Sequence, residues 1–411
     1  MEQGSKYILL MLMVLLAGSC FHFISLFAGL PVAVPAVLTA AAAVLLYLKI
    51  VPVNTLAQGE IKVTSWVALA VYTICVAVLT QKVLATAKKY GEWDAWAIWN
   101  YHARFLTSHD HWRNVFLNQE NDHPDYPLGL PSAVAFVWRM TGSAAGFVAP
   151  FAIALFTTLA TPTLIFSEFY KKNLTVATLG LMLFAGNTFF IHIGVAQYAD
   201  PLLGLFFLAA IVSLDHVTEH PVYVAVAAAC IGGCVWIKNE GLILAVLTMV
   251  FYGHLFFSRR YIKLTIAGIA LPLITWVLFR SCVLSANDLV DGLNGDTWKK
   301  LFDSSRYDMI LHQLNVNMHE HFPYLKGLAI FYLLACLLRR KRPDRQMLLV
   351  GACLLAYMSI YIVTRHDLEW HLVTSQNRLL LQLMPAFIYA LSVKFGGRPK
   401  LNYSQFSFRQ M

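Results

Sequence analysis

The sequence has few charged residues. Asp, Glu, Lys and Arg make up only 13% of its 411 residues, whereas 58% are hydrophobic. The mean hydropathy of +0.61 is too high for an ordinary soluble domain, which needs polar side chains to cover its surface. This composition excludes a soluble globular protein and predicts an all-α, polytopic integral membrane protein.

Cysteine is scarce as well, and several signature motifs are missing. The seven cysteines lie in or at the ends of apolar runs, and no two form a Cys-x-x-Cys pair, so neither a disulfide framework nor a zinc site is expected. The chain also lacks a Gly-rich phosphate loop and an RNA-binding signature, so its net charge of +9 does not indicate a nucleic-acid partner. Membrane lipids are the expected partners of its basic residues.

Long apolar runs are what the sequence has in abundance. A membrane-spanning helix needs about 20 predominantly apolar residues, and about twelve such runs, some of them shorter, occur along the chain. They fall at 7–28, 31–51, 63–84, 145–167, 174–193, 201–215, 222–237, 241–257, 264–283, 326–339, 347–363 and 379–394. We therefore expect about twelve transmembrane helices.

Basic residues indicate which loops face the cytoplasm, because Lys and Arg are retained on that side. With the N-terminus inside, the basic clusters at 171–172, 259–263 and 339–345 all fall in inner loops. We divide the chain into an N-terminal transmembrane hairpin, a transmembrane region with the outer loops, and a cytoplasmic tail. Their bounds are 1–62, 63–394 and 395–411, and the long outer loops are 85–144, 284–325 and 364–378.

Two of the outer loops differ in pattern. The first contains a helical stretch at 92–106 and an apolar piece at 128–140, and we expect both to form juxtamembrane helices along the membrane surface. The second, at 284–325, has little apolar periodicity and is expected to form a small surface element.

The first outer loop carries the most informative motif, Glu92-Trp93-Asp94-Ala95-Trp96-Ala97-Ile98-Trp99. Its three tryptophans recur every three positions and would share one side of a helix. Two interpretations of Asp94 stay open. Either it is a general base that deprotonates an acceptor hydroxyl beside tryptophans that stack on a sugar, or it is a hydrated residue of an interfacial helix that the tryptophans anchor.

The polar turn His123-Pro124-Asp125-Tyr126-Pro127 also has two interpretations. It is either a lid or acceptor-binding turn beside Asp94, or a loop-to-helix junction in which Pro127 begins a helix. Asp200, which precedes Pro201, has the position of a helix cap, and a cap at the surface of a site can also bind a ligand.

Several cations lie at the predicted outer surface. Lys238 either pairs with Glu240 in the same short turn or faces a wet cavity, because charges at this depth need a partner or water. Arg280 lies near the outer end of its span. Arg378 opens the last span near His371, and it either grips phosphate oxygens through its bidentate guanidinium group or snorkels to lipid headgroups.

These motifs together resemble a known family. Trp93-Asp94-Ala95-Trp96 in a long outer loop, Tyr126-Pro127 before a short amphipathic helix, and Tyr198-Ala199-Asp200 before a later span are similar to motifs of the GT-C superfamily of polytopic glycosyltransferases. The similarity is to the bacterial branch that includes lipid A aminoarabinose transferase and protein O-mannosyltransferases. It covers residues 63–394. The chain departs from the pattern in its two preceding spans and in having no large soluble C-terminal domain.

The resemblance implies transfer of a sugar from a polyprenyl-phosphate carrier to a lipid, glycan or protein acceptor. The reaction would take place at the outer face of the membrane, on the periplasmic side of a bacterial inner membrane. Asp94 would be the catalytic aspartate and Asp200 the second acidic position of the family. The expected donor-phosphate ligands are Arg378, Lys238, Arg280 and His371, and the expected substrate contacts are Trp93, Trp96, His123, Asp125, Tyr126 and Glu240. No cofactor is required, and the residues do not indicate a divalent metal.

A transporter or flippase of a lipid-linked saccharide is the main alternative function, since it would also need polar groups near lipid headgroups. Such a protein is expected to place polar residues at mid-membrane along a pathway. Here the predicted topology gathers the charges at the outer rim, which favours the enzyme. A non-catalytic scaffold would leave that gathering unexplained.

Overall fold

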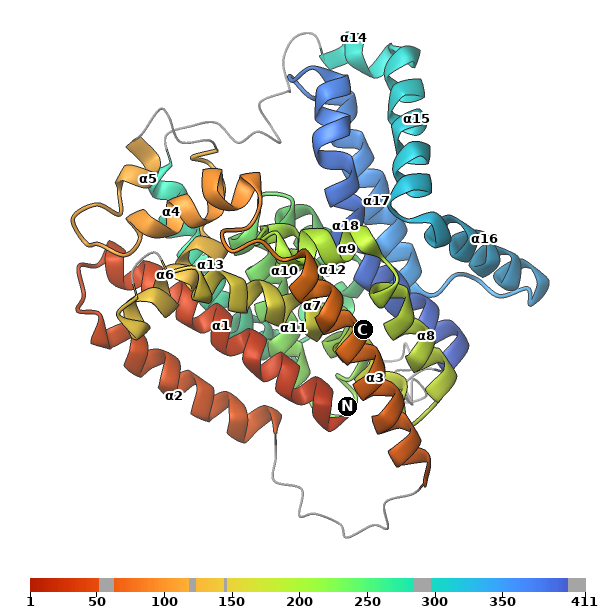
Figure 1. The fold of residues 1–411 in the computed structure, drawn as a ribbon, viewed down its shortest axis with the longest axis horizontal. Coiled ribbons are helices and arrows are strands. Elements are labelled where there is room, and N and C mark those ends of the chain that lie inside the picture. Colours follow the sequence, from red (N-terminus) through yellow and green to blue (C-terminus); the bar gives the residue numbers. More distant parts are fainter. Residues whose placement is uncertain (52–62, 118–122, 144–145, 284–296, 398–411) are drawn as a thin grey trace.

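The computed structural model describes residues 1–51, 63–117, 123–143, 146–283 and 297–397 of the chain (Figure 1). Within these residues all regular secondary structure is helical, which confirms the predicted all-α class. In chain order the elements are α1 (Gln3–Phe27), α2 (Ala33–Ile50), α3 (Val63–Thr86), the π-helix η1 (Ala95–Trp99), α4 (Asn100–Phe105), α5 (Asn114–Leu117), α6 (Gly129–Thr141), α7 (Val148–Phe169), α8 (Leu174–Ala185), α9 (Thr188–Val195), α10 (Ala199–Asp215), α11 (Val222–Ile237), α12 (Gly241–Phe256), α13 (Ile262–Cys282), α14 (Thr297–Phe302), α15 (Ser304–Glu320), α16 (Pro323–Leu338), α17 (Arg345–Val363) and α18 (Leu368–Gly396).

Each predicted apolar run falls on a helix or on a bent pair of helices. Seven helices are long and apolar enough to cross a membrane, or up to nine if each of two bent pairs counts as one span. The seven are α1, α2, α3, α7, α13, α17 and α18. The pairs are α8 with α9, bent by 66°, and α15 with α16, bent by 106°. This set of long apolar helices is that of a helical membrane protein.

Helix α10 lies at the centre of the bundle. All of its 17 residues, from Ala199 to Asp215, are buried, and it packs against α7, α11 and α18. A helix that is apolar on all sides is stable only when it is surrounded, and here protein surrounds it. Gly204 allows α18 to approach closely, because a Cβ at this position would lie 3.0 Å from the carbonyl oxygen of Gln382.

Helix α1 is part of the same core. It packs against α2, α6, α7, α11 and α13. The Ser19 hydroxyl donates a hydrogen bond to the Gly129 carbonyl at 2.7 Å and accepts one from the indole of Trp236 at 2.9 Å. By contrast, α2 buries only Pro35, Thr39 and Ile50. The predicted boundary at residue 62 stays a prediction, because residues 52–62 lie outside the described part of the chain.

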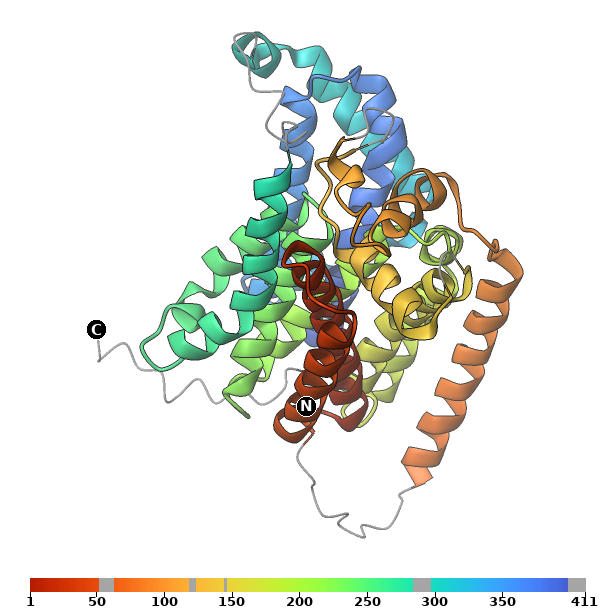
Figure 2. The ribbon, with the colours of Figure 1, turned by 90° about the vertical axis from the view of Figure 1, so that its left-hand side faces the viewer.

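Helix ends meet in two groups at opposite ends of the bundle. In one group, the side chain of Arg345 at the start of α17 contacts His254 near the end of α12 at 3.0 Å. Lys394 near the end of α18 binds Asp344 at 3.0 Å. We call this group the basic end. The other group includes the C-terminal end of α17 and the N-terminal half of α18, and α14 and α15 project beside them (Figures 1 and 2).

The long predicted loops are more ordered than their patterns suggest. In the first, the predicted helical stretch at 92–106 is a π-helix followed by α4, and the predicted second helix is α6. Pro127 does not begin α6, which starts at Gly129 with Leu128 as its N-cap residue. In the second, α15 is a full 17-residue helix, although residues 284–296 lie outside the described part.

The last helix begins much earlier than expected. The prediction placed its start at residue 379, but α18 begins at Leu368. The Asp367 side chain caps it by accepting a hydrogen bond from the Trp370 backbone N–H at 2.8 Å. Its polar first half then packs against α15, where Asn317 donates to Gln376 at 2.8 Å. The buried face of this part of the helix thus combines Leu368, Leu372 and Leu379 with the polar Gln376.

Candidate functional site

Asp94 lies at the start of the π-helix η1, where it is the N-cap residue. A π-turn has more residues than an α-turn and often occurs at functional positions. It also separates the tryptophans: Trp93 and Trp96 are exposed and pack edge to face with ring centroids 4.4 Å apart. Trp99 is fully buried and stacks on Tyr126 at 5.7 Å. The prediction that all three tryptophans share one side is therefore wrong for Trp99.

The Asp94 carboxylate forms an ion pair with Arg378 of α18. Both side chains are mostly buried, with 16% of Asp94 and 20% of Arg378 exposed. Tyr198 lies beside both. Its hydroxyl accepts a hydrogen bond from the Asp94 backbone N–H at 3.3 Å, and its ring faces the Arg378 guanidinium at 5.8 Å. Burial and the nearby Asp94 carboxylate raise the pKa of Tyr198 to about 12, so its hydroxyl stays protonated at neutral pH.

Gly91 brings the Asp94 segment against the turn that precedes α10. Its φ angle is +73°, and a Cβ there would lie 2.5 Å from the Ala196 carbonyl oxygen. The next backbone N–H, of Glu92, donates to the same carbonyl at 3.1 Å. Only glycine combines this backbone conformation with such a close approach, so Gly91 fixes the position of Asp94 relative to Tyr198.

A second set of charges lies between α10 and the turn that joins α11 to α12. The Lys238 ammonium binds Asp200 at 2.9 Å and Glu240 at 3.0 Å. Asp200 is fully buried, and it also accepts a hydrogen bond from Gln382 of α18 at 2.6 Å. The pairing of Lys238 with Glu240 that the turn suggested is therefore present.

The position of Asp200 differs from the predicted cap. The N-cap residue of α10 is Tyr198, without a side-chain cap bond, and Asp200 lies inside the first turn. Its carboxylate points to Lys238 instead of the helix backbone, because the lysine offers a charge-assisted bond to this fully buried group. One oxygen of Asp200, Oδ2, has no hydrogen-bond partner among the described residues.

A cavity of about 110 Å³ opens beside these charges, and we call it the Arg378 cavity. Arg378, Lys238 and Glu240 line it together with His371. Buried polar atoms almost always have a partner, but Arg378 Nε and Glu240 Oε2 have none among the described residues. Charged residues of both signs, Arg378, Lys238 and Glu240, thus line the cavity.

The His123 turn forms one wall of the Arg378 cavity. The rings of His123 and Tyr126 stack with centroids 4.2 Å apart and both line the cavity. Asp125 is buried, and its carboxylate accepts a hydrogen bond from Asn239 at 2.8 Å. The turn therefore ties the first loop to the α11–α12 turn, with Tyr126 reaching back to Trp99.

Six predicted site residues do not line the Arg378 cavity. Asp94, Asp200 and Asp125 each bind a residue that does line it. The other three are Arg280 in the last turn of α13 and the exposed Trp93 and Trp96. These three residues therefore do not contribute to the walls of this cavity.

The sequence also left some site residues unnoticed. Gln382 lies within the last predicted apolar run, and Tyr357 lies within the run before it. The Tyr357 hydroxyl donates a hydrogen bond to the Gln382 side-chain oxygen at 2.7 Å. A single amide or hydroxyl inside a predicted span is the signal that would have found them, because such groups need a partner in the membrane.

Comparison with models of protein families, with curated proteins and with solved structures found no match for this chain.

Proposed function

We propose that the protein is a GT-C-type glycosyltransferase that moves a sugar from a polyprenyl-phosphate carrier to a lipid, glycan or protein acceptor. The reaction would take place at the outer face of a membrane such as the bacterial inner membrane. The observation that carries the proposal is the ion pair of Asp94 with Arg378, because Arg378 also lines a cavity that Lys238 shares. The proposed base is thus paired with one of the two proposed phosphate-binding cations, and both cations line one cavity.

The helix ends support the topology that this function requires. If the bent pairs and the short helices α10, α11 and α12 also cross, the chain makes about twelve crossings. Residues of the site then come from helix ends on one side: Tyr198 before α10, Lys238 after α11, and Tyr361, which also lines the Arg378 cavity, near the end of α17. Arg345 and Lys394 lie at the basic end, on the other side, as retention of cations in the cytoplasm predicts.

The chemistry needs little besides these residues. The acceptor hydroxyl attacks the anomeric carbon of the donor sugar, and Asp94 takes the hydroxyl proton as the carbon–oxygen bond to the phosphate breaks. The carrier leaves as its phosphate dianion, and the cations Arg378 and Lys238 stabilise the charge that develops on it. A single displacement of this kind inverts the anomeric centre.

Arg378 can serve both Asp94 and a donor phosphate. It pairs with Asp94 and also lines the cavity in which we place the phosphate, so an entering phosphate competes with Asp94 for it. A guanidinium group has five N–H donors in a fixed fork, so Arg378 can bind the phosphate with some of them and keep Asp94 oriented with others. Tyr198 holds the Asp94 backbone in place during this exchange.

A panel of polyprenyl-phosphate sugars tests the proposal. Purified protein in nanodiscs is incubated with each donor and an extract of acceptors, and release of polyprenyl phosphate is measured. We expect Asp94→Asn to lower turnover about a hundredfold or more, since a general base contributes at least that much, and to leave donor binding intact. Arg378→Ala is expected to weaken donor binding and turnover together, because each lost charge-assisted bond is worth roughly 1.5–3 kcal/mol.

The matched control is Glu92→Gln. Glu92 lies two positions from Asp94 but pairs with Lys88 at 2.7 Å instead of Arg378. Neutralising the Glu92 carboxylate should therefore leave turnover within about twofold of the wild-type rate. Wild-type turnover by folded Asp94→Asn would remove Asp94 from catalysis. Translocation of the donor across the membrane without release of polyprenyl phosphate would identify a flippase instead.

A further inference from the structure

A second cavity lies beside the Asp94 segment, and it is larger than the first. Its volume is about 610 Å³, against about 110 Å³ for the Arg378 cavity. We call it the Lys89 cavity. Lys88, Lys89 and Arg104 line it, together with the aromatic rings of Tyr90, Trp96 and Trp138. Nothing in the proposed donor chemistry uses this space.

The charge of this cavity has one sign. Three cations line it, and none of its described lining residues is acidic. Lys88 is paired with Glu92, whereas the Lys89 ammonium lies beside the rings of Tyr90 and Phe147, at 5.2 and 4.9 Å from their centroids. Lys89 and Arg104 converge on the cavity without an ion pair among the described residues, and such cations raise the local concentration of anions.

The aromatic lining complements this charge. Trp96 is 51% exposed, so one face of its indole is available to a ligand, as in the sites where aromatic rings cover apolar faces. A sugar ring has such an apolar face. At the inner wall Asn100 and Gln197 are buried and bonded to each other. Cations beside an open indole match an anionic saccharide better than a neutral lipid chain.

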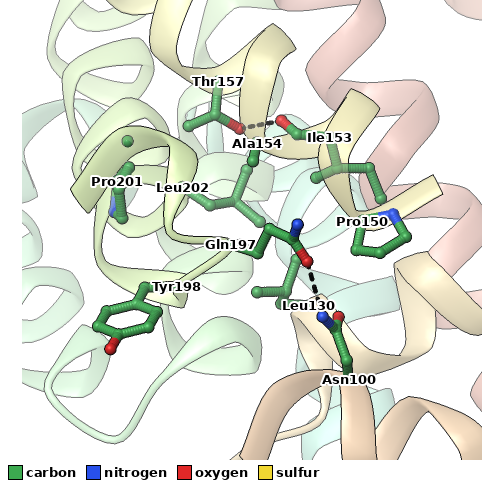
Figure 3. Close-up of a pocket in the computed structure, with 11 residues that line it drawn as sticks. Asn100, Leu130, Pro150, Ile153, Ala154, Thr157, Gln197, Tyr198, Pro201 and Leu202 are labelled. Carbon is green, nitrogen blue, oxygen red and sulfur yellow. Dashed lines mark hydrogen bonds between the residues drawn. The ribbon is translucent and has the colours of Figure 1, made fainter. Parts of the chain in front are cut away.

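The wall between the two cavities contains the catalytic segment. Asn100 donates a hydrogen bond to Gln197 at 2.7 Å, and Figure 3 shows this pair facing a small pocket while Tyr198 points away from it. Gln197 has a φ angle of +64°, a conformation that is uncommon for any residue but glycine. Because of this turn, Gln197 faces the Lys89 cavity while the next residue, Tyr198, contacts Asp94 and Arg378.

We infer that the Lys89 cavity binds the acceptor, and that the acceptor is an anionic saccharide. Its phosphate or carboxylate group meets Lys89 and Arg104, and a sugar ring lies on Trp96. An acceptor held there lies on the Gln197 side of the turn whose next residue, Tyr198, contacts Asp94, while the donor phosphate lies at Arg378. The assignment of the bound saccharide as the acceptor rests on the proposed glycosyl transfer, whereas binding of the anion can be measured without any donor.

Saturation-transfer NMR on the full-length protein in phosphatidylcholine nanodiscs tests the inference. The probes are glucose 6-phosphate, glucose and inorganic phosphate, all without donor. We expect ring-proton signals from glucose 6-phosphate but not from glucose, and suppression of these signals by inorganic phosphate. The double variant Lys89→Gln, Arg104→Gln should weaken binding by about tenfold or more, since each exposed ion pair contributes up to about fivefold.

Two further variants separate the site from the fold. Arg113→Gln removes a cation of the same loop that stacks on Trp112 and lines neither cavity, so it should bind like wild type. Trp96→Leu changes an exposed ring and should lower the ring-proton signals without lowering thermal stability. Equal signals from neutral glucose, or unchanged binding by the folded double variant, would overturn the inference.

The source of the anion is decided by nanodiscs that contain phosphatidylglycerol. If these lipids suppress the glucose 6-phosphate signals, the anion belongs to a lipid headgroup, and if they do not, it belongs to a soluble saccharide. Donor turnover reports separately on the proposed function. If the anion binds through Lys89 and Arg104 but the protein cleaves no donor, the anion site is supported and glycosyl transfer is refuted. If the protein cleaves donor but anion binding does not depend on Lys89 and Arg104, glycosyl transfer is supported and the anion site is refuted.

Discussion

Replacing Lys238 by Met should destabilise the protein strongly. The ammonium group bridges Asp200 at 2.9 Å and Glu240 at 3.0 Å, and only 4% of its side chain is exposed. Met fills a similar volume but leaves the fully buried Asp200 carboxylate with Gln382 as its remaining donor. Removing one partner of a buried ion pair costs about 3–5 kcal/mol, because the other charge stays without compensation.

A double-mutant cycle separates this cost from lost packing. In Asp200→Asn the side chain keeps its shape and its bond from Gln382, so this variant should lose less stability than Lys238→Met. The double variant Lys238→Met, Asp200→Asn no longer buries an uncompensated charge at position 200. Its loss should therefore be smaller than the sum of the two single losses by about 1 kcal/mol or more.

Reversible unfolding by SDS in mixed micelles measures these free energies. Lys326→Met serves as the control, since Lys326 is exposed and binds Asn315 at 2.8 Å, and surface substitutions of this kind change stability by less than about 0.5 kcal/mol. A loss below about 1 kcal/mol for Lys238→Met, or strict additivity in the cycle, would show that water screens the cluster and that it is not a buried ion pair.

Two further outcomes are expected. Gly91→Ala should cost about 1–2 kcal/mol of stability through its left-handed backbone, and it should also lower turnover, because its Cβ would clash with the Ala196 carbonyl oxygen. Gly142 has a φ of +65° and no atom within 4 Å of an added Cβ, so Gly142→Ala should show the backbone strain alone. Equal effects of the two variants on turnover would refute the positioning role of Gly91. Burial lowers the pKa of His102 to about 4, so the unfolded chain takes up the proton first and stability should fall as the pH drops from about 6.5 to about 4. His102→Leu should flatten this melting-temperature profile while His312→Leu, at an exposed position, should not, and parallel profiles would contradict the assignment.

The sequence predicted the helices well because long apolar runs leave the backbone few alternatives in a membrane. It failed where polar residues continue a helix. Residues 368–378 have the composition of a loop, and their helix depends on partners far away in the chain, such as Asn317 for Gln376. The π-helix at Ala95–Trp99 has no compositional signal either, so the burial of Trp99 could not be foreseen.

The site shows the same division. Asp94, Asp200, Lys238 and Arg378 could each be selected from the sequence, because a charge beside an apolar run needs a reason. Their pairing could not, since Arg378 and Asp94 are 284 positions apart and meet only through the packing of α18 on α10. Local reasoning paired Lys238 with its neighbour in the turn and missed its second carboxylate.

The charges of the cluster suit the proposed reaction. The carboxylates of Asp94, Asp200 and Glu240 meet the two cations Arg378 and Lys238, so the cluster has one excess negative charge. During transfer the Asp94 carboxylate is neutralised by a proton in the step in which the carrier phosphate gains a negative charge, so the total charge does not change. Arg378 contacts Asp94 and also lines the cavity, so one cation can stabilise the negative charge before and after it moves. Apolar side chains could replace a mostly buried ion pair at little cost in stability. A role of Arg378 in stabilising the moving charge gives a reason for the pair to be present.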